Sequence, residues 1–178
     1  MTAPAPARIV PTIRSATAAD AAALLAIYAP FVEHTAVSFE TAPPGEDEFA
    51  ARIRAVTAQW SWLVAECDGA IAGFAYGGTH RARPAYRWSV ETSAYIDPRF
   101  QRRGIGTALY RALFEALIAR GYCNAFAGAT LPNDASVALH RRVGFEPIGV
   151  FRRVGYKFGR WHDVAWMQRG LRDAPPTE

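Results

Sequence analysis

The chain has 178 residues with a net charge of +4, and 51% of its residues are hydrophobic. This length fits one domain with a sizeable core, and this composition excludes a disordered chain. No apolar run approaches the ~20 residues that a membrane-spanning helix needs, so we expect no membrane anchor.

We expect one domain over residues 8–171, with a tail at each end. Residues 1–7 contain alanine and proline without the apolar stretch of a secretory signal, and residues 172–178 are short and proline-containing. The two cysteines, Cys67 and Cys123, form no C-x-x-C pair, so neither a disulfide framework nor a zinc site is expected. A reducing, cytoplasmic location is therefore the expected one.

The first half of the chain predicts a strand, two helices and a β-hairpin. Thr17 to Asp20 resembles a capping box that opens the first helix, and we expect Pro30 to disrupt that helix. Asp68-Gly69 is a strong hairpin signal between two apolar runs. The expected ranges are a strand at 8–15, a helix from residue 17, a charged helix at 46–57, and strands at 62–67 and 71–76.

The second half predicts four strands and two helices. Asp97-Pro98 should end the first of these strands, because proline cannot continue a ladder of hydrogen bonds. The expected ranges are strands at 87–96 and 124–130, helices at 107–120 and 133–143, and final strands at 147–158 and 161–168 around a turn at Gly159-Arg160. Because three consecutive strands precede the helix at 107–120, strict alternation fails, and we predict an α/β (α+β) domain with a mixed sheet and helices on its faces.

The segment Gln101 to Gly106 joins an apolar strand to a helix and predicts a phosphate-binding cradle. Glycine allows a tight turn and close approach to a ligand, and the first N–H groups of a helix attract anions. A dinucleotide fingerprint does not fit, because its third glycine is replaced by Leu109, and no P-loop string occurs. The alternative is an ordinary glycine-rich turn with solvated arginines.

Glu91 and His140 are candidates for proton transfer. Glu91 lies in an aromatic-flanked strand, where burial would raise its pKa and suit a general base, although it could instead face water at a sheet edge. His140 lies four residues after Ser136, on the same helix face, and titrates near neutral pH. The alternative for His140 is a helix-surface histidine.

The loop after residue 79 carries Arg81, Arg83 and Tyr86, which could clamp a carboxylate, phosphinate or sulfoximine group. The alternative is a solvated basic loop. Phe39 could form the wall of a small pocket or belong to the core.

Together these features resemble the GNAT superfamily of N-acetyltransferases. Q-x-x-G-x-G resembles its acyl-CoA loop, and the order of elements resembles its fold over residues 8–171, which implies a mostly antiparallel sheet of about seven strands with four helices. Six strings resemble the phosphinothricin/methionine sulfoximine N-acetyltransferase family, and the most distinctive is the last, at residues 158–164. They are V-S-F-E-T, W-L-V-A-E, Y-x-W-S-V-E, Y-I-D-P-R-F-Q-R-R-G-I-G, L-P-N-D-A-S-V-x-L-H and F-G-R-W-H-D-V.

The resemblance implies direct transfer of acetyl from acetyl-CoA to the amine of an amino-acid-like substrate, without a metal. Glu91 would be the general base and His140 a second proton-transfer residue, and a strand bulge near Ala94 or Tyr95 would aim an N–H at the thioester. The implied cofactor residues are Ala94, Tyr95, Ile96, Arg102, Arg103, Gly104, Ile105, Gly106, Thr107, Asn133 and Ser136. The implied substrate residues are Phe39, Arg81, Arg83, Tyr86, Thr92 and Ser93.

The resemblance also implies a homodimer, and three departures bear on the substrate. Arg81 stands where the herbicide-resistance enzymes have lysine, and Pro84 and Arg87 also differ from them. Many GNAT enzymes have tyrosine at the position of His140. The alternatives are a GNAT enzyme for another amine and a non-catalytic acyl-CoA-binding regulator. The arginine-rich loop argues against a polycation, and the short arginine clusters argue against nucleic acid.

Overall fold

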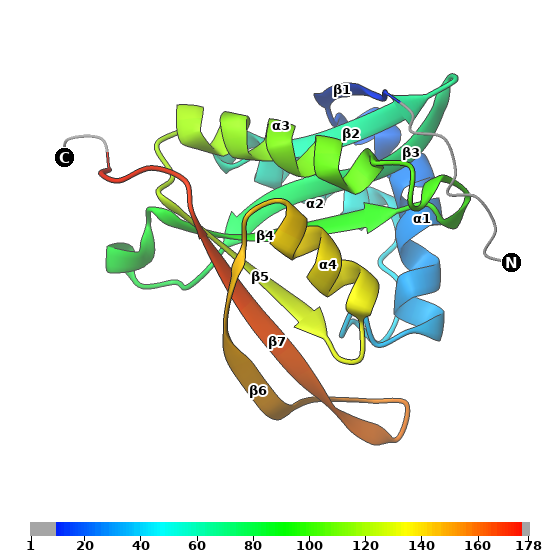
Figure 1. The fold of residues 1–178 in the computed structure, drawn as a ribbon. Helices are drawn as coiled ribbons and strands as arrows, with labels where there is room; N and C mark the ends of the chain where they lie inside the picture. The colour runs from blue at the N-terminus through cyan, green and yellow to red at the C-terminus, as the bar shows by residue number, and fades with distance from the viewer. Residues whose placement is uncertain (1–9, 176–178) are drawn as a thin grey trace, which may run out of the picture.

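The computed structural model describes residues 10–175, and within them seven strands form one sheet in the order β1-β2-β3-β4-β5-β7-β6 (Figure 1). The strands are β1 Thr12–Ser15, β2 Trp62–Cys67, β3 Ala70–Thr79, β4 Ser89–Ile96, β5 Asn124–Thr130, β6 Glu146–Lys157 and β7 Arg160–Gly170. The α-helices are α1 Ala21–His34, α2 Glu46–Gln59, α3 Ile105–Ala119 and α4 Asp134–Arg142. Short 3-10 turns lie at Ala18–Asp20, Pro84–Tyr86 and Pro98–Phe100.

The sheet is mixed and mostly antiparallel, which confirms the predicted fold class. Among the described strand pairs, β4 with β5 is the parallel one, and its ladder joins only Ser89–Glu91 to Asn124–Phe126. Beyond this point β4 continues along β3 and β5 continues along β7. The two central strands therefore part in the middle of the sheet.

Two hydrophobic cores cover the two faces of the sheet. Helices α3 and α4 lie on one face and α1 and α2 on the other (Figure 1). Val90 and Ala94 of β4 pack with the α3 core, whereas Tyr95 packs with the α1 core. Because side chains of a strand alternate between faces, Thr92 belongs to the α3 face, and Glu91 and Ser93 belong to the α1 face.

Local signals placed most elements correctly. Strand 124–130 has the predicted bounds. The helix predicted at 46–57 begins where predicted and ends two residues later, at Gln59. Asp68 and Gly69 both have positive φ, as a tight hairpin turn between β2 and β3 requires. The final turn is wrong by one residue, since β6 and β7 are joined by Phe158-Gly159. The predicted tail at residues 1–7 lies outside the described part, and no helix within residues 10–175 is long and apolar enough to cross a membrane.

The prediction that Pro30 disrupts the first helix is wrong. Helix α1 continues through Pro30 to His34. Its buried residues lie on both sides of the proline, with Leu24 and Ile27 before it and Val32 after it. Tertiary packing along this face outweighs the hydrogen bond that proline cannot donate.

We predict that Pro30→Ala stabilises the protein. Alanine would restore a donor for the helix interior and remove the ring clash, raising the free energy of unfolding by about 1 to 3 kcal/mol. Urea unfolding followed by circular dichroism measures this change. Pro147→Ala, in the edge strand β6, is the control and should change stability by less than about 0.5 kcal/mol. A Pro30→Ala protein no more stable than wild type would contradict the claim that Pro30 destabilises α1 and that packing outweighs this cost.

Candidate active site

A cavity of about 640 Å³ occupies the place where β4 and β5 part. Thr92 is part of the lining, and its Oγ1 donates to the Phe126 carbonyl oxygen at 3.1 Å across the two strands. Residues from both faces of the sheet line the cavity. They include Ser38, Phe39, Glu40, Tyr76, Glu91, Thr92, Ser93, Ala94, Tyr95, Tyr110, Thr130, Asn133, Ser136, His140, Phe151, Val154 and Trp166.

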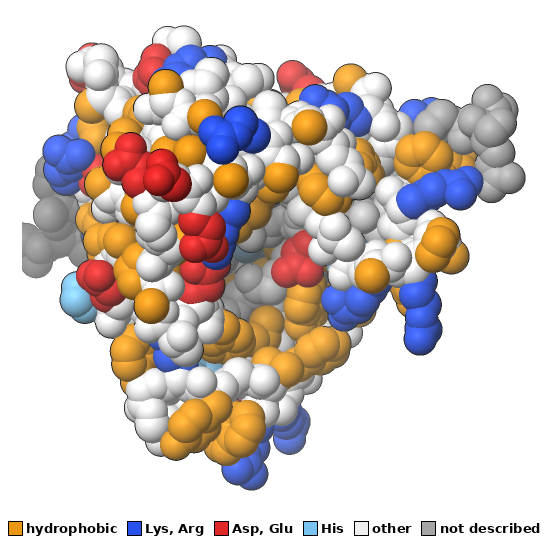
Figure 2. Space-filling view, turned by 180° about the vertical axis from the view of Figure 1, so that it is seen from behind, with side chains coloured by type: hydrophobic (Ala, Val, Ile, Leu, Met, Phe, Trp, Pro, Cys, Tyr) orange, Lys and Arg blue, Asp and Glu red, His pale blue; other side chains and the backbone are white. Residues whose placement is uncertain are grey.

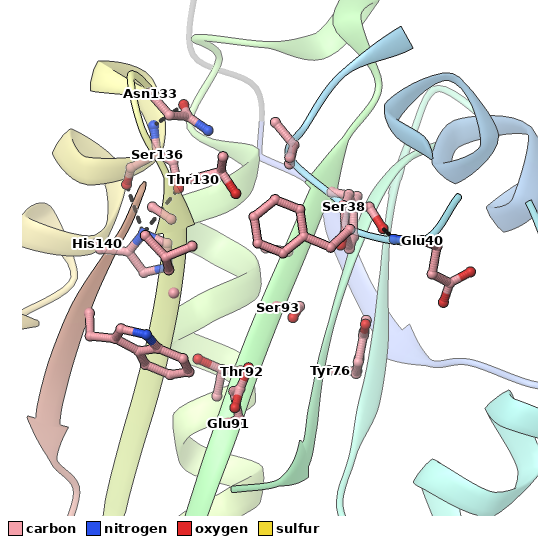
Figure 3. A pocket seen from close by; sticks show the side chains of 18 of the residues that line it. Ser38, Glu40, Tyr76, Glu91, Thr92, Ser93, Thr130, Asn133, Ser136 and His140 are labelled. Carbon is pink, nitrogen blue, oxygen red and sulfur yellow. Dashed lines mark hydrogen bonds between the residues drawn. The ribbon is translucent and has the colours of Figure 1, made fainter. Parts of the chain in front are cut away.

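The cavity has two sides with different chemistry (Figure 3). His140, Ser136 and Asn133 lie on the α4 side, and Ser38 and Glu40 lie on the opposite side, with β4 between them. Seen from behind, the molecule is hollowed, with acidic side chains beside the hollow and hydrophobic side chains below it (Figure 2). Residues of both faces of the sheet therefore line one cavity around β4.

Glu91 places a half-buried carboxylate on the α1 face of the cavity. Its register neighbours are Gly78 on β3 and Phe126 on β5. Burial raises the pKa of Glu91, and the positive charge of Arg81 partly opposes this shift. The direction agrees with the sequence prediction of a raised pKa, and a raised pKa makes the carboxylate a better proton acceptor.

His140 is buried and joined to Tyr110 rather than exposed on the helix surface. Its Nδ1 lies 2.7 Å from the Ser136 carbonyl oxygen, which can only accept, so Nδ1 carries the hydrogen. Its Nε2 then accepts from the Tyr110 hydroxyl at 2.8 Å. Burial lowers the pKa of His140 and raises that of Tyr110, so both groups are neutral at pH 7.

The loop between α1 and α2 forms the outer wall of the cavity on the α1 face. Ser38 is held by the Tyr28 hydroxyl at 2.7 Å. Glu40 accepts from Arg52 Nη1 at 2.5 Å, and Arg52 also pairs with Glu48. Arg52 therefore balances the Glu40 charge, and Phe39 lies between these two anchored residues.

The predicted phosphate cradle lies at the N-terminus of α3, outside the cavity lining. Gly104 has φ of 92°, a conformation that favours glycine, and caps the helix. Position 106 requires glycine for a different reason, the close packing of α3 against α4. A Cβ there would lie 2.8 Å from Leu139 Cδ2 of α4. Arg102 is exposed and Arg103 is partly buried beside Phe100. The free N–H groups of this helix end and the two guanidinium groups can bind phosphates.

The structure brings only part of the sequence-predicted residues together around the cavity. The predicted cofactor residues Ile96 and Arg102 to Thr107 lie outside its lining. So do three predicted substrate residues, Arg81, Arg83 and Tyr86, all exposed on the loop between β3 and β4. Arg81 is nearest, with Cζ 5.9 Å from the ring centre of Trp166, which does line the cavity. The cavity is lined by Phe39, Glu91, Thr92, Ser93, Ala94, Tyr95, Asn133, Ser136 and His140.

Two details differ from the sequence analysis. The β3–β4 register runs without a shift from Gly73–Ile96 to Thr79–Val90, so the bulge expected near Ala94 is absent from this described ladder. The Asn133 side chain caps helix α4, because its Oδ1 accepts from the Ser136 N–H at 3.1 Å, whereas the resemblance assigns Asn133 to the cofactor. Instead of a bulge, β4 beyond Glu91 has no ladder with β5, which leaves backbone on this side for a ligand.

Sequence reasoning missed Tyr110, Glu40 and Trp166. Tyr110 sits among the leucines of a buried helix stripe, where an aromatic residue is expected to be core. The available signal was its hydroxyl, since a buried Tyr O–H needs a partner. Nothing local in the sequence placed Glu40 or Trp166 at the cavity.

Comparison with known proteins gives consistent matches. The sequence matches the family described as "Acetyltransferase (GNAT) domain" over residues 13–166. It is 42% identical to a phosphinothricin N-acetyltransferase of Streptomyces viridochromogenes, over 92% of this chain and 90% of that protein. It is 35% identical to an L-methionine sulfoximine/L-methionine sulfone acetyltransferase of Salmonella typhimurium, over 90% and 94%. The fold matches the crystal structure of a GNAT phosphinothricin acetyltransferase from Sinorhizobium meliloti in complex with AcCoA, with a TM-score of 0.89, 37% identity and 94% of each chain covered.

We predict that Glu91→Gln stabilises the fold in a pH-dependent way. Because the folded-state pKa of Glu91 is raised, its contribution to stability is full below the ordinary pKa of about 4.3 and is lost as pH rises through the folded value. Glutamine removes this penalty, so the urea midpoint should rise at pH 8 and not at pH 3.5. Glu115→Gln, exposed on α3, is the control. Equal shifts at both pH values would contradict the assignment.

Proposed function

This chain belongs to the GNAT acetyltransferases, within the phosphinothricin and methionine sulfoximine N-acetyltransferase family, and we propose that its acceptor is the amino group of a small amino-acid-like molecule. The observation that carries this proposal is the gap between β4 and β5. It presents the Glu91 carboxylate on one face and the Tyr110–His140 pair on the other, around one cavity. Phosphinothricin, methionine sulfoximine and methionine sulfone are the candidate acceptors.

Acetyl-CoA is the acetyl donor, as in the AcCoA-bound relative of known structure. We assign its pyrophosphate to the α3 N-terminus, from Arg102 to Thr107. Positively charged Arg102 and Arg103 flank that helix end, which supports the assignment. The rest of the cofactor would follow Ala94, Tyr95 and Ile96 on β4, with Asn133 and Ser136 on the facing helix. Backbone groups of β4 without a β5 ladder support this path.

Transfer is proposed to be direct, with both substrates bound. Glu91 takes a proton from the ammonium group, and the amine lone pair then attacks the thioester carbonyl carbon. The carbon–sulfur bond breaks, the nitrogen loses its second proton as the amide forms, and the CoA sulfur leaves as thiolate. The Tyr110 hydroxyl of the Tyr110–His140 pair gives a proton to that sulfur, and the second proton from the nitrogen restores the pair through solvent, while Glu91 releases its own proton to solvent. Neither cysteine is available for an acyl-enzyme, since Cys67 and Cys123 are buried and outside the cavity lining.

The acceptor's anionic end would lie toward Arg81. This residue stands at the rim, close enough to Glu91 to influence its pKa, and its guanidinium can pair with a carboxylate or phosphinate. Arg83 and Tyr86 share its loop and would reach the acceptor if the loop folds over the mouth. Phe39, Thr92 and Ser93 would contact the part of the acceptor near the amine, which their place in the cavity supports.

We predict CoA thiol release with small anionic amino acids. The assay offers acetyl-CoA with phosphinothricin, methionine sulfoximine, methionine sulfone, the common amino acids, spermidine and kanamycin. Turnover should be fastest on the first three, because Arg81 attracts their anionic groups and repels polycations. Turnover on spermidine or kanamycin alone would overturn the acceptor. No turnover with retained acetyl-CoA binding would favour an acyl-CoA-binding regulator.

Glu91→Gln is the control for chemistry in that assay. It should lower kcat at least about a hundredfold, the usual range for a general base, while acetyl-CoA affinity stays near wild type. In the wild type, kcat should rise with pH through the raised pKa of Glu91. A variant with wild-type rates at every pH would remove Glu91 from the mechanism.

We also propose a homodimer formed through the outer face of the β6–β7 hairpin. Strand β6 is an edge strand with exposed apolar side chains, including Ile148 and Val150. Light scattering should give twice the 19.5 kDa of one chain. Ile148→Lys with Val150→Lys should give the single-chain mass, whereas the control Ile118→Lys, exposed on α3, should not. A wild type of single-chain mass would contradict the dimer.

A further inference from the structure

Lys157, at the end of β6, is the only lysine of this chain, in which Lys and Arg together number 20. It is buried, with 6% of its surface exposed. A buried ammonium group is costly unless hydrogen bonds replace its water shell. Its partners therefore show why a lysine stands here.

The Lys157 ammonium group donates to three backbone carbonyl oxygens near the end of α1. Nζ lies 2.6 Å from Val32 O, 2.9 Å from Thr35 O and 2.8 Å from Ser38 O. Three acceptors match the three donors of an ammonium group, and Val32 lies in the last turn of α1, where carbonyls lack helical partners. Arginine cannot direct three donors from one point, so the site selects lysine.

The strand end that carries Lys157 is held in place by its own hairpin. Phe158 and Gly159 both have positive φ, which is the conformation of a two-residue type I′ turn. His162 Nε2 lies 3.0 Å from the Lys157 carbonyl oxygen and donates to it. Gly155, Lys157 and His162 are all buried, and strand alternation puts Gly155 and Lys157 on one face.

Phe39 makes a second contact with the same hairpin. A Cβ on Gly155 would lie 2.2 Å from Phe39 Cζ and within 2.7 Å of two further ring atoms. The phenyl ring therefore lies directly on the backbone of Gly155 and needs a residue without a side chain there. The ring centroid is 6.2 Å from that of His162.

These two contacts join the walls of the cavity. One wall is the α1–α2 loop with Val37, Ser38 and Phe39, and the other is the hairpin with Phe151 and Val154. The Lys157–Val32 contact connects positions 125 residues apart in the chain. Among the strands that the structure describes, no pairing links this loop to the hairpin, so these contacts help to fix the position of one wall relative to the other.

We propose that Lys157 is a positioning residue that, together with the Phe39–Gly155 contact, fastens the α1–α2 loop to the β6–β7 hairpin and sets the width of the cavity on the α1 face. This inference rests on the proposed function, because the cavity side concerned is the one assigned to the amine. Lys157 touches no reacting atom and acts through Ser38 and Phe39. The acetyl-CoA side, at α3 and α4, does not depend on it.

We call the Lys157 hydrogen bonds and the Phe39–Gly155 contact together the fastener. Two variants remove one part of the fastener each. Lys157→Met keeps the length of the side chain and removes its three donors. Gly155→Ala leaves Lys157 intact and displaces the Phe39 ring, in a backbone conformation without positive φ that alanine can adopt. The matched controls are Arg160→Met, an exposed cation across the same hairpin, and Gly170→Ala, at the end of β7 with nothing within 4 Å of the added Cβ.

Steady-state kinetics provides the first test, with the acceptor that wild type uses best. Each fastener variant should raise KM for the acceptor at least about tenfold, as expected for loss of roughly one good contact, and leave KM for acetyl-CoA within about twofold. Both controls should match wild type. A purely structural role would raise both KM values together or neither. Either of those results in a folded variant overturns the inference, and Gly155→Ala decides it if Lys157→Met does not fold.

Hydrogen exchange provides a second test that needs no acceptor. Amides of residues 35–40 should exchange faster in both fastener variants than in wild type and the controls, while acetyl-CoA binding stays unchanged. If wild type acetylates none of the acceptors, the proposed function fails, and this exchange result alone decides whether the fastener exists. If wild type is active and residues 35–40 exchange at the wild-type rate in both variants, the fastener is refuted and the function stands.

Discussion

The early end of the parallel β4–β5 ladder is the constraint on which the rest of the site depends. The ladder stops at Glu91 and Phe126, yet each strand keeps its other partner, so the sheet opens without losing its outer pairings. Backbone polar groups that face the opening need partners, and a bound ligand can supply them. The gap therefore both creates the cavity and makes β4 a surface for binding an extended molecule.

Strand alternation turns this gap into a site with two chemistries. Neighbouring residues of β4 face opposite cores, so Glu91 and Thr92 lie on different sides although they are adjacent in sequence. Burial acts differently on the two sides. It raises the pKa of Glu91 on the α1 face, and it keeps His140 and Tyr110 neutral on the α3 face. The residues proposed as base and proton donor thus lie on opposite faces of the sheet, each in its own packed surroundings.

The sequence allowed the order of elements to be predicted, because this order depends on local signals, and long family strings supplied the candidate site residues, part of which line the cavity. Asp68-Gly69 and the 124–130 strand are local, and their predictions are confirmed. The prediction that Pro30 disrupts α1 is wrong, because packing of the helix residues before and after it outweighs local propensity. Tyr110 looked like core, since its partner lies 30 residues away, and the role of Lys157 depends on carbonyls more than 100 residues distant. The roles of all the predicted site residues stay proposals, and Arg81, Arg83 and Tyr86 also lie outside the cavity lining.

A crystal structure with CoA and an acceptor such as methionine sulfone tests the central claim most directly. CoA carries no acetyl group, so the two molecules can be bound together without reacting. The account predicts that CoA follows β4 through the gap with its sulfur on the Tyr110 side, and that the acceptor nitrogen lies on the opposite side within hydrogen-bonding reach of Glu91 or of one intervening water. Both molecules on one face of the sheet, or an acceptor nitrogen far from Glu91, would contradict it.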